Sequence, residues 1–445
     1  MEIVTIHNSS PLVSFRLLFK TGSAYDPEGK QGLAALTAAM LSDGGSRAMS
    51  YDEIVQAMYP MATSFSSQVD KEMTVFFGTT HIDNLGSYYR LISDMLLDPG
   101  WREEDFKRLK ENMINYLRIN LRSVNEEELG KEALYSFIYE GHPYAHPSVG
   151  LAGSLERLTL EDVKSFYSDK YSAASFVLGL AGGYPEGFEK QVESDFASKL
   201  PSGGSYELEL PAPRAISGLE MRVIKKETRA TAISFGHPIA VTRSHEDWPA
   251  LLVAQSFFGQ HRSSNSLLYQ RLRQVRGLNY GDYAYIEYFP RGMFQFHPDP
   301  NLGRRQQIFE VWIRPVEAKN GLFALRAALY ELNKLVENGL TEEDFEATRR
   351  FLMKFVNVLT RTQDAQLGYA LDSAYYWIPD FNQYVRERLS RLTLDDVNRA
   401  IKTHIQAENL KIVAVTEDAE AFLDSALNDR PSPITYETPM PDEVL

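Results

Sequence analysis

The chain has 445 residues, of which 44% are hydrophobic and 24% are charged, and this composition indicates a globular protein long enough for two domains, each with its own core. Its net charge of −14 and the absence of a long basic run argue against a surface for nucleic acid or for an anionic membrane. The chain contains no cysteine, which excludes disulfides, thiolate nucleophiles and cysteine-ligated zinc. The lack of cysteine fits a cytosolic protein as well as an exported one, so it does not identify the cellular compartment.

In the first half, predicted strands bracket a predicted helix at residues 32–41. Apolar side chains dominate this stretch, and Asp43-Gly44-Gly45 ends it. The strands are predicted at 3–6, 12–20 and 73–79, and later helices at about 82–97 and 103–122. The first residues lack the basic-then-apolar layout of a signal peptide, and no stretch approaches the ~20 apolar residues of a membrane span.

A segment rich in Pro, Gly and Ser, PSGGSYELELPAPRAISG (201–218), predicts a boundary between two domains. We place the first domain at 1–205, the linker at 206–218 and the second domain at 219–445. The second half repeats the plan of the first, with strands near 221–226 and 231–236, a helix at 247–258, and later helices at 320–337 and 342–361.

Two pairs of similar segments indicate that the chain arose by internal duplication. RLTLEDVKSFYSDKY, which begins at 157, resembles RLTLDDVNRAIKTHI, which begins at 391, so the offset is 391 − 157 = 234 residues. The tetrapeptide EEDF occurs at 103 and again at 342, with an offset of 342 − 103 = 239. Because unrelated segments recur in the same order at nearly one offset, duplication explains them better than chance.

Three stretches together resemble one protein family. TGSAYDPEGKQGLAALTAAML (21–41) carries Asp-Pro-x-Gly and Gly-Leu-Ala, GHPYAHPSVG (141–150) carries His-Pro-Tyr, and NSLLYQRLRQVRGLNYGDYAY (265–285) carries Leu-Arg-x-x-x-Gly-x-x-Tyr. These patterns resemble the pitrilysin/insulinase family of zinc peptidases over nearly the whole chain. The resemblance implies an α+β fold of two homologous domains, each a mostly antiparallel sheet packed with helices.

The resemblance also marks what this chain lacks. The family's zinc helix carries His-x-x-Glu-His, and this chain has Ala35, Ala38 and Ala39 at these positions. Histidines at i and i+4 share one helix face and grip the metal, while the Glu takes a proton from metal-bound water. Alanine keeps the helix but offers no lone pair and no base. The family's third ligand, a Glu, would fall near Asn115 or Tyr116, so we expect this chain to bind no metal or cofactor.

The remaining histidines give no alternative metal motif. His142 and His146 are spaced i,i+4, but a proline follows each, so a structured loop is expected rather than a metal-binding helix. His81 and His297 are expected to be ordinary polar or surface residues.

Arg273 and Tyr280 are the candidate functional residues that this chain retains. In the family, an Arg and a Tyr seven residues apart contact substrate, and here 280 − 273 = 7. The resemblance implies that the Arg holds the peptide backbone and that the Tyr hydroxyl stabilises the tetrahedral intermediate. Arg276 could take the place of Arg273. Alternatively, Arg273 is a helix-surface residue and Tyr280 a strand residue packed in the core.

The stretch MATSFSSQVDKEMTVFF (61–77) resembles the family's edge strand, which pairs with extended peptide by strand addition. Small polar residues suit a strand whose edge stays open, and they are Thr63, Ser64, Ser66 and Ser67. An ordinary half-exposed strand is the alternative interpretation.

Two functions fit this pattern. In the first, the chain is the subunit of a two-chain peptidase that lacks zinc, and it contributes Arg273 and Tyr280 to a site whose zinc is held by a homologous His-x-x-Glu-His sister chain. In the second, it is an inactive scaffold or peptide-binding protein, like the core proteins of respiratory complex III. The sequence disfavours an independent zinc peptidase. Bacterial two-chain members of the family are often exported, which favours the periplasm and leaves the cytoplasm open.

Overall fold

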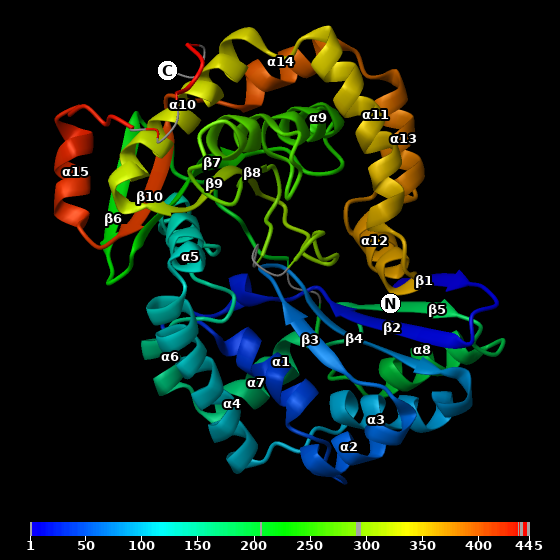
Figure 1. Cartoon of the computed structure of the whole chain (residues 1–445). Coiled ribbons are helices and arrows are strands. Elements are labelled where there is room, and N and C mark those ends of the chain that lie inside the picture. Colours follow the sequence, from blue (N-terminus) through cyan, green and yellow to red (C-terminus); the bar gives the residue numbers. More distant parts are fainter. Residues whose placement is uncertain (1, 205–206, 291–294, 435, 437–438, 443–445) are drawn as a thin grey trace.

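The computed structural model describes residues 2–204, 207–290, 295–434, 436 and 439–442, and it contains two five-stranded sheets packed with helices (Figure 1). The fold is therefore α+β, as the sequence predicts. In the first half the elements are β1 (Glu2–His7), β2 (Leu12–Phe19), α1 (Leu33–Asp43), α2 (Tyr51–Met58), β3 (Ser66–Val69), β4 (Thr74–His81), α3 (Leu85–Leu97), α4 (Glu103–Asn115), α5 (Glu126–Ile138), α6 (Ala152–Arg157), α7 (Leu160–Lys170), β5 (Phe176–Gly182) and α8 (Phe188–Lys199).

The second half follows the same plan. Its elements are β6 (Leu219–Lys225), β7 (Ala230–Ile239), α9 (Trp248–Gly259), β8 (Asp282–Tyr285), β9 (Gln307–Glu317), α10 (Gly321–Asn338), α11 (Glu342–Leu359), α12 (Gln363–Tyr375), α13 (Phe381–Arg391), α14 (Leu394–His404), β10 (Leu410–Thr416) and α15 (Ala419–Leu427).

The two sheets have the same topology. Their strand orders are β1-β5-β2-β4-β3 and β6-β10-β7-β9-β8. When the strands are numbered from the start of each half, the two orders are identical. In both sheets the first pair is parallel and the other pairs are antiparallel. The sheets are therefore mostly antiparallel, and the shared order confirms that the two halves are homologous repeats.

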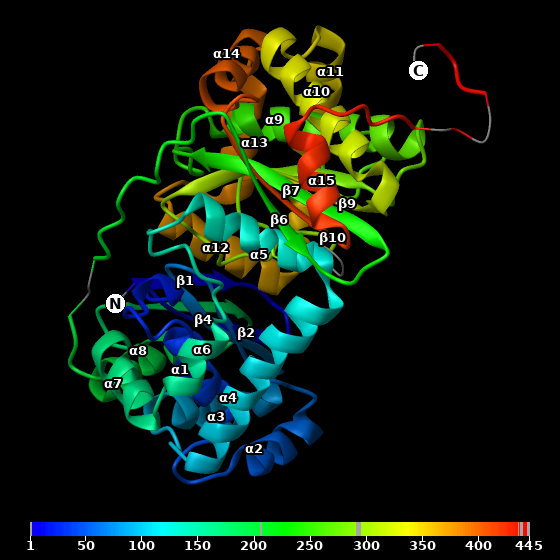
Figure 2. The same cartoon turned by 90° about the vertical axis from the view of Figure 1, so that its left-hand side faces the viewer.

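Helices α5 and α12 cross between the halves. Helix α5, from the first half, packs on β7 and β10 of the second sheet, while α12, from the second half, packs on β1, β2 and β5 of the first sheet. Both helices lie between the two sheets (Figures 1 and 2). They occupy equivalent places in the repeat, since 363 − 126 = 237 is close to the offsets of the repeated segments. Each half thus completes the other.

This exchange explains why the central strand β2 is buried on both faces. In β2, every residue from Val13 to Phe19 is buried, including the ones that point away from the first core. Leu18, on that second face, packs with Met73, Val75, Val177 and Leu371, the last of which belongs to α12. The same face also carries Ser14 and Arg16, so β2 alternates between apolar and polar residues although both of its faces are buried.

The structure differs from several predicted element bounds. Residues 61–77 do not form one strand: β3 ends at Val69, and a turn in which the Asp70 N–H donates to the carbonyl of Met73 leads into β4. The predicted helix at 103–122 is α4 followed by a π-helical stretch, Tyr116–Val124. Strand β9 was not predicted. None of the helices in the described ranges is long and apolar enough to span a membrane.

Candidate functional site

Helix α1 begins where the buried carboxylate of Asp26 accepts two backbone hydrogen bonds. The N–H groups of Gly32 and Ala34 donate to its two oxygens at 2.6 and 2.7 Å. Gly32 has φ 106°, and a Cβ there would lie 2.9 Å from the Val149 carbonyl oxygen, so both conformation and space require glycine. Burial raises the pKa of Asp26 to about 7, although both backbone hydrogen bonds favour the ionised form.

The three alanines of α1 have two different environments. Ala35 and Ala39 line a cavity of about 540 Å³ that lies between the halves. Ala38 is fully buried in the core of the first half. Because the three methyl groups carry no lone pair, these positions do not fit a zinc ion or its catalytic base.

Helix α4 and the π-helical stretch after it form the wall of this cavity that faces α1. Leu121 lines it together with Leu109, Asn112, Met113 and Tyr116, and the spacing of these last four defines one helix face. Asn115 is exposed and lies outside the lining. Of the two positions proposed for the third ligand, the geometry therefore favours Tyr116.

Carboxylates line other parts of the cavity, but among the described residues they do not form a group with the spacing of metal ligands. Glu128 and Glu132 come from α5, one turn apart, and Glu128 forms an ion pair with Lys131 at 2.9 Å. Burial raises the pKa of Glu132. Asp70 is already held by Arg304, whose Nε and Nη2 donate to it at 2.7 and 2.5 Å.

Within the described residues, one group has ligand atoms close enough to hold a metal, and it lies elsewhere. His245, Asp247 and His404 place these atoms within 4.8 Å of one another. However, the His245 Nδ1 accepts the Asp247 N–H at 3.0 Å, and Arg399 donates to both Asp247 oxygens at 2.6 and 3.2 Å. The Arg399 bonds, and after them the contact of the His404 Nε2 with Asp247 at 2.8 Å, lower the pKa of Asp247 to about 2. The group is best explained as an ion-pair cluster that joins α14 to the start of α9.

The histidines that the sequence set aside lie in ordinary surroundings. His142 and His146 lie in the loop between α5 and α6, and the Nδ1 of His142 accepts the Tyr144 N–H at 3.0 Å. His81 ends β4, where its Nδ1 accepts the N–H of Asp83. The ring of His297 lies 5.8 Å from that of Phe355.

Strand β3 forms one edge of the first sheet, but it contains only part of the predicted set. Ser66 and Ser67 belong to β3, and Ser67 lines the cavity beside α1. Thr63 and Ser64 precede the strand. The Thr63 hydroxyl donates to the Thr79 carbonyl at 2.5 Å, and the Ser64 carbonyl accepts from a tyrosine hydroxyl of α3. Only Ser66 and Ser67 are thus placed to present an open strand edge.

Arg273 and Tyr280 lie together on the second half. Arg273 belongs to a short π-helical stretch, Tyr269–Gln274, and its Nη1 donates to the Tyr280 carbonyl at 2.9 Å. Its guanidinium carbon lies 4.7 Å from the Tyr269 ring centroid and 5.8 Å from that of Tyr280. The Tyr280 side chain is 76% exposed, and Gly281 separates it from β8. Tyr280 is therefore not a packed strand residue.

A second cavity, of about 440 Å³, surrounds this pair. Residues that the sequence reading missed complete it: Arg262, Ser264, Tyr269, Tyr283, Phe296 and Arg314. Arg276 lies outside, where its Nη1 donates to the Arg271 carbonyl at 2.8 Å. Guanidinium groups beside aromatic rings suit peptide carbonyls and carboxylates. Only the basic and aromatic composition of 262–283 could have signalled this cavity.

Among the residues that the structure describes, the cavity at Arg273 and Tyr280 and the cavity at Ala35 and Ala39 share no lining residue. The two sets that the resemblance places in one active site are therefore in different cavities of this chain.

Comparisons with known proteins agree with this architecture. Residues 2–150 match the family model described as insulinase (peptidase family M16), and residues 157–352 match the one described as peptidase M16 inactive domain. The non-peptidase homolog YmxG of Helicobacter pylori is 20% identical over 414 residues, which cover 91% of this chain and 89% of that protein. Subunit 1 of the mitochondrial cytochrome b-c1 complex of Caenorhabditis elegans is 21% identical, with 96% and 88% covered.

A solved structure has the same fold. The peptidase M16 inactive domain from Pseudomonas fluorescens superposes with a TM-score of 0.81 at 20% identity, covering 93% of this chain and 95% of that one. Both halves, their shared topology and the two matching family models lead to one conclusion: this chain belongs to the insulinase family of M16 peptidases.

Proposed function

We propose that this chain is the zinc-free subunit of a two-chain peptidase, in which a homologous His-x-x-Glu-His sister chain holds the zinc. The observation that carries the proposal is selective loss. The zinc-helix positions Ala35, Ala38 and Ala39 carry no metal ligand, while Arg273 and Tyr280 lie side by side on an exposed surface.

The pair has the chemistry that peptide hydrolysis needs from a second subunit. The Arg273 guanidinium offers directed N–H donors to peptide carbonyls, and the Tyr280 hydroxyl adds a donor without a charge. The Tyr280 carbonyl and the Tyr269 ring already hold the Arg273 side chain in place. Substrate binding therefore costs little additional side-chain entropy at Arg273. Donors fixed in advance stabilise the charge that develops on a tetrahedral intermediate.

The separation of the two cavities supports a site shared between chains. Since Arg273 and Tyr280 do not line the cavity that contains Ala35 and Ala39, the described part of this chain places the two sets in separate cavities. A sister chain with the same two-half plan can place its zinc helix opposite the Arg273–Tyr280 surface. Peptides are the expected substrates, and zinc is expected on the sister chain.

The test is zinc-dependent cleavage of a fluorogenic peptide by the co-purified pair of chains. Arg273→Ala and Tyr280→Phe in this chain are expected to lower kcat/KM by about 10²-fold each, the usual effect of removing one donor to a developing oxyanion. Arg276→Ala is the matched control, because Arg276 lies outside the cavity, and it should leave turnover nearly unchanged. Unchanged turnover in both test variants would refute the shared site.

An inactive scaffold is the second proposed function. It is favoured by two relatives, one named a non-peptidase homolog and the other a subunit of the cytochrome b-c1 complex. The same preparation separates the two functions. A stable complex with the sister chain that shows no zinc-dependent proteolysis would support the scaffold.

A further inference from the structure

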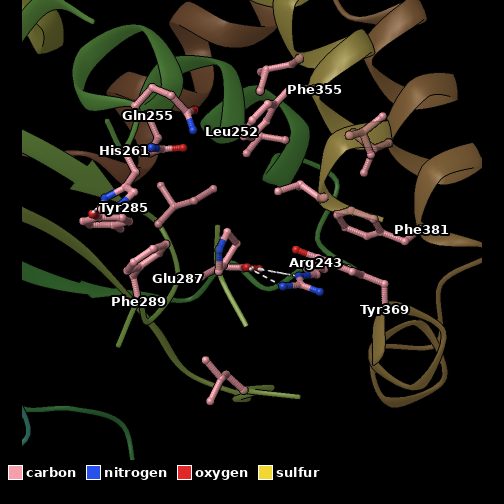
Figure 3. A pocket seen from close by; sticks show the side chains of 18 of the residues that line it. Arg243, Leu252, Gln255, His261, Tyr285, Glu287, Phe289, Phe355, Tyr369 and Phe381 are labelled. Atoms are coloured by element: carbon pink, nitrogen blue, oxygen red, sulfur yellow. Dashed lines mark hydrogen bonds and ion pairs between the residues drawn. The ribbon is translucent and has the colours of Figure 1, made fainter. Parts of the chain in front are cut away.

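A third cavity lies within the second half, between α9, the helices α11 to α13 and the segment that follows β8 (Figure 3). Its volume is about 120 Å³. Most of its wall is apolar, and the side chains that form it include Leu252, Tyr285, Phe289, Phe355, Tyr369 and Phe381.

At one end of this cavity the charged residues bind one another. Arg243 donates to Glu287 at 3.0 Å and to Asp372 at 3.0 Å, and the indole N–H of Trp248 donates to Glu287 at 3.0 Å. Figure 3 shows the Arg243–Glu287 bonds at the edge of the cavity. Because the charges of Arg243, Glu287 and Asp372 are compensated within the cavity wall, they do not require a charged ligand.

At the other end the polar residues are also bonded within the protein. His261 lies between the Tyr285 hydroxyl, 2.5 Å from its Nδ1, and the Gln295 carbonyl, 2.8 Å from its Nε2. Gln255 donates to the Ala284 carbonyl at 2.7 Å. A ligand here replaces no hydrogen bond, so the chemistry favours an apolar occupant.

The size of the cavity restricts that occupant further. An apolar cavity of roughly 150 Å³ holds one benzene molecule and stays dry without it. A space of about 120 Å³ therefore suits a single aromatic ring or a branched aliphatic group, and it is too small for a whole lipid or a drug-sized molecule.

Phe296 joins this cavity to the Arg273–Tyr280 cavity. It lines both, its side chain is 66% exposed, and the Arg262 guanidinium carbon lies 4.5 Å from its ring centroid. If a peptide backbone lies at Arg273 and Tyr280, the apolar cavity therefore lies next to it, with only the Phe296 side chain between them.

We infer that the third cavity receives a bulky apolar side chain, aromatic or branched aliphatic, of a peptide bound at Arg273 and Tyr280. The inference rests on the proposed function for where the peptide lies, and it adds the class of side chain that the second half selects.

The test measures peptide binding to the full-length chain alone, by fluorescence polarisation. Two labelled pentapeptides differ only at the central residue, which is Phe in one and Ala in the other. The Phe peptide is expected to bind at least tenfold more tightly, because the cavity removes its ring from water. Leu252→Phe fills the cavity and should abolish this preference. Val358→Phe adds similar bulk to α11 outside the cavity, so it should preserve the preference.

Arg273→Ala separates this inference from the proposed function. It should weaken both peptides by the same factor and leave their affinity ratio unchanged. Equal binding of the two peptides to the natural chain would overturn the inference, as would a folded Leu252→Phe variant that keeps the preference. Failure of the Phe peptide to bind would overturn it too. If Leu252→Phe does not unfold cooperatively, Phe355→Trp is used to fill the cavity instead, because Phe355 is half-buried and lines it. A Phe355→Trp variant that still binds the Phe peptide more tightly than the Ala peptide also overturns the inference.

Discussion

Ala38 differs from Ala35 and Ala39 in what surrounds its methyl group. Ala35 and Ala39 face the cavity between the halves, whereas Ala38 is sealed in the first core. A glutamate at position 38 would place a carboxylate among apolar side chains, which is costly without a partner. Returning His, Glu and His to α1 would therefore disturb the core, and the third ligand would still be missing because neither Asn115 nor Tyr116 carries a carboxylate.

Asp26 should make stability depend on pH. The folded protein holds its proton up to about pH 7, whereas the unfolded chain releases it near the ordinary value of 3.8. Between these values folding takes up a proton, so the free energy of unfolding falls as pH rises through this window. Asp26→Asn is neutral at every pH. Urea denaturation at about pH 4.5 and about pH 8 measures the free energy of unfolding at both ends of this window. Its decrease from the lower to the higher pH should be larger in the natural protein than in the variant. Equal losses would contradict the assignment.

At the scale of elements, the crossing helices α5 and α12 each carry a glycine, and the two glycines differ in available space. A Cβ on Gly130 would lie 3.4 Å from the Ser234 hydroxyl and 3.5 Å from Val415, which is ordinary contact with the second sheet. A Cβ on Gly368 would lie 2.4 Å from the Pro300 ring, which cannot move aside easily. The same substitution should therefore have opposite effects on two equivalent helices.

Gly130→Ala should stabilise the protein by about 0.5–1 kcal/mol, because alanine loses less backbone entropy in a helix. Gly368→Ala should destabilise it by about 1–3 kcal/mol through overpacking. Chemical denaturation of both variants checks the pair, and each serves as the other's control. Destabilisation by both would mean that α5 does not pack on the second sheet with the spacing described.

At the scale of the whole molecule, buried ion pairs join the two halves. Asp70 follows β3 in the first half and Arg304 precedes β9 in the second, and their side chains are 1% and 2% exposed. The buried Arg16 of β2 also crosses between the halves, binding the 39% exposed Asp364 side chain at 2.6 Å and the Asn301 side chain at 2.7 Å. The halves are therefore fixed to each other by polar contacts as well as by the crossing helices.

Removing either partner of the Asp70–Arg304 pair should cost about 3–5 kcal/mol, since a buried charge is left without its counterion. Asp70→Asn, Arg304→Met and the double variant form a cycle, and the double variant should lose clearly less than the sum of the singles. Glu207→Gln is the control. It breaks the exposed Arg305–Glu207 pair, whose atoms lie 3.6 Å apart, and it should cost at most about 1 kcal/mol. Additive single effects would refute a direct coupling.

The sequence by itself determined the features that depend on local pattern. The repeated RLTL and EEDF segments predicted two homologous halves, and the resemblance of residues 21–41 to the family's zinc helix predicted that Ala35, Ala38 and Ala39 replace its ligands and base. The spacing of Arg273 and Tyr280 was also readable, because both lie within one short segment whose backbone brings them together.

Only the tertiary structure decided which distant segments meet. The exchange of α5 and α12, the separation of the two cavities and the place of Phe296 between two of them depend on contacts across the chain. Helix periodicity shows that a face is apolar, but it does not show which sheet that face covers. That choice is made by the packing of the whole molecule, where each half supplies the helix that the other lacks.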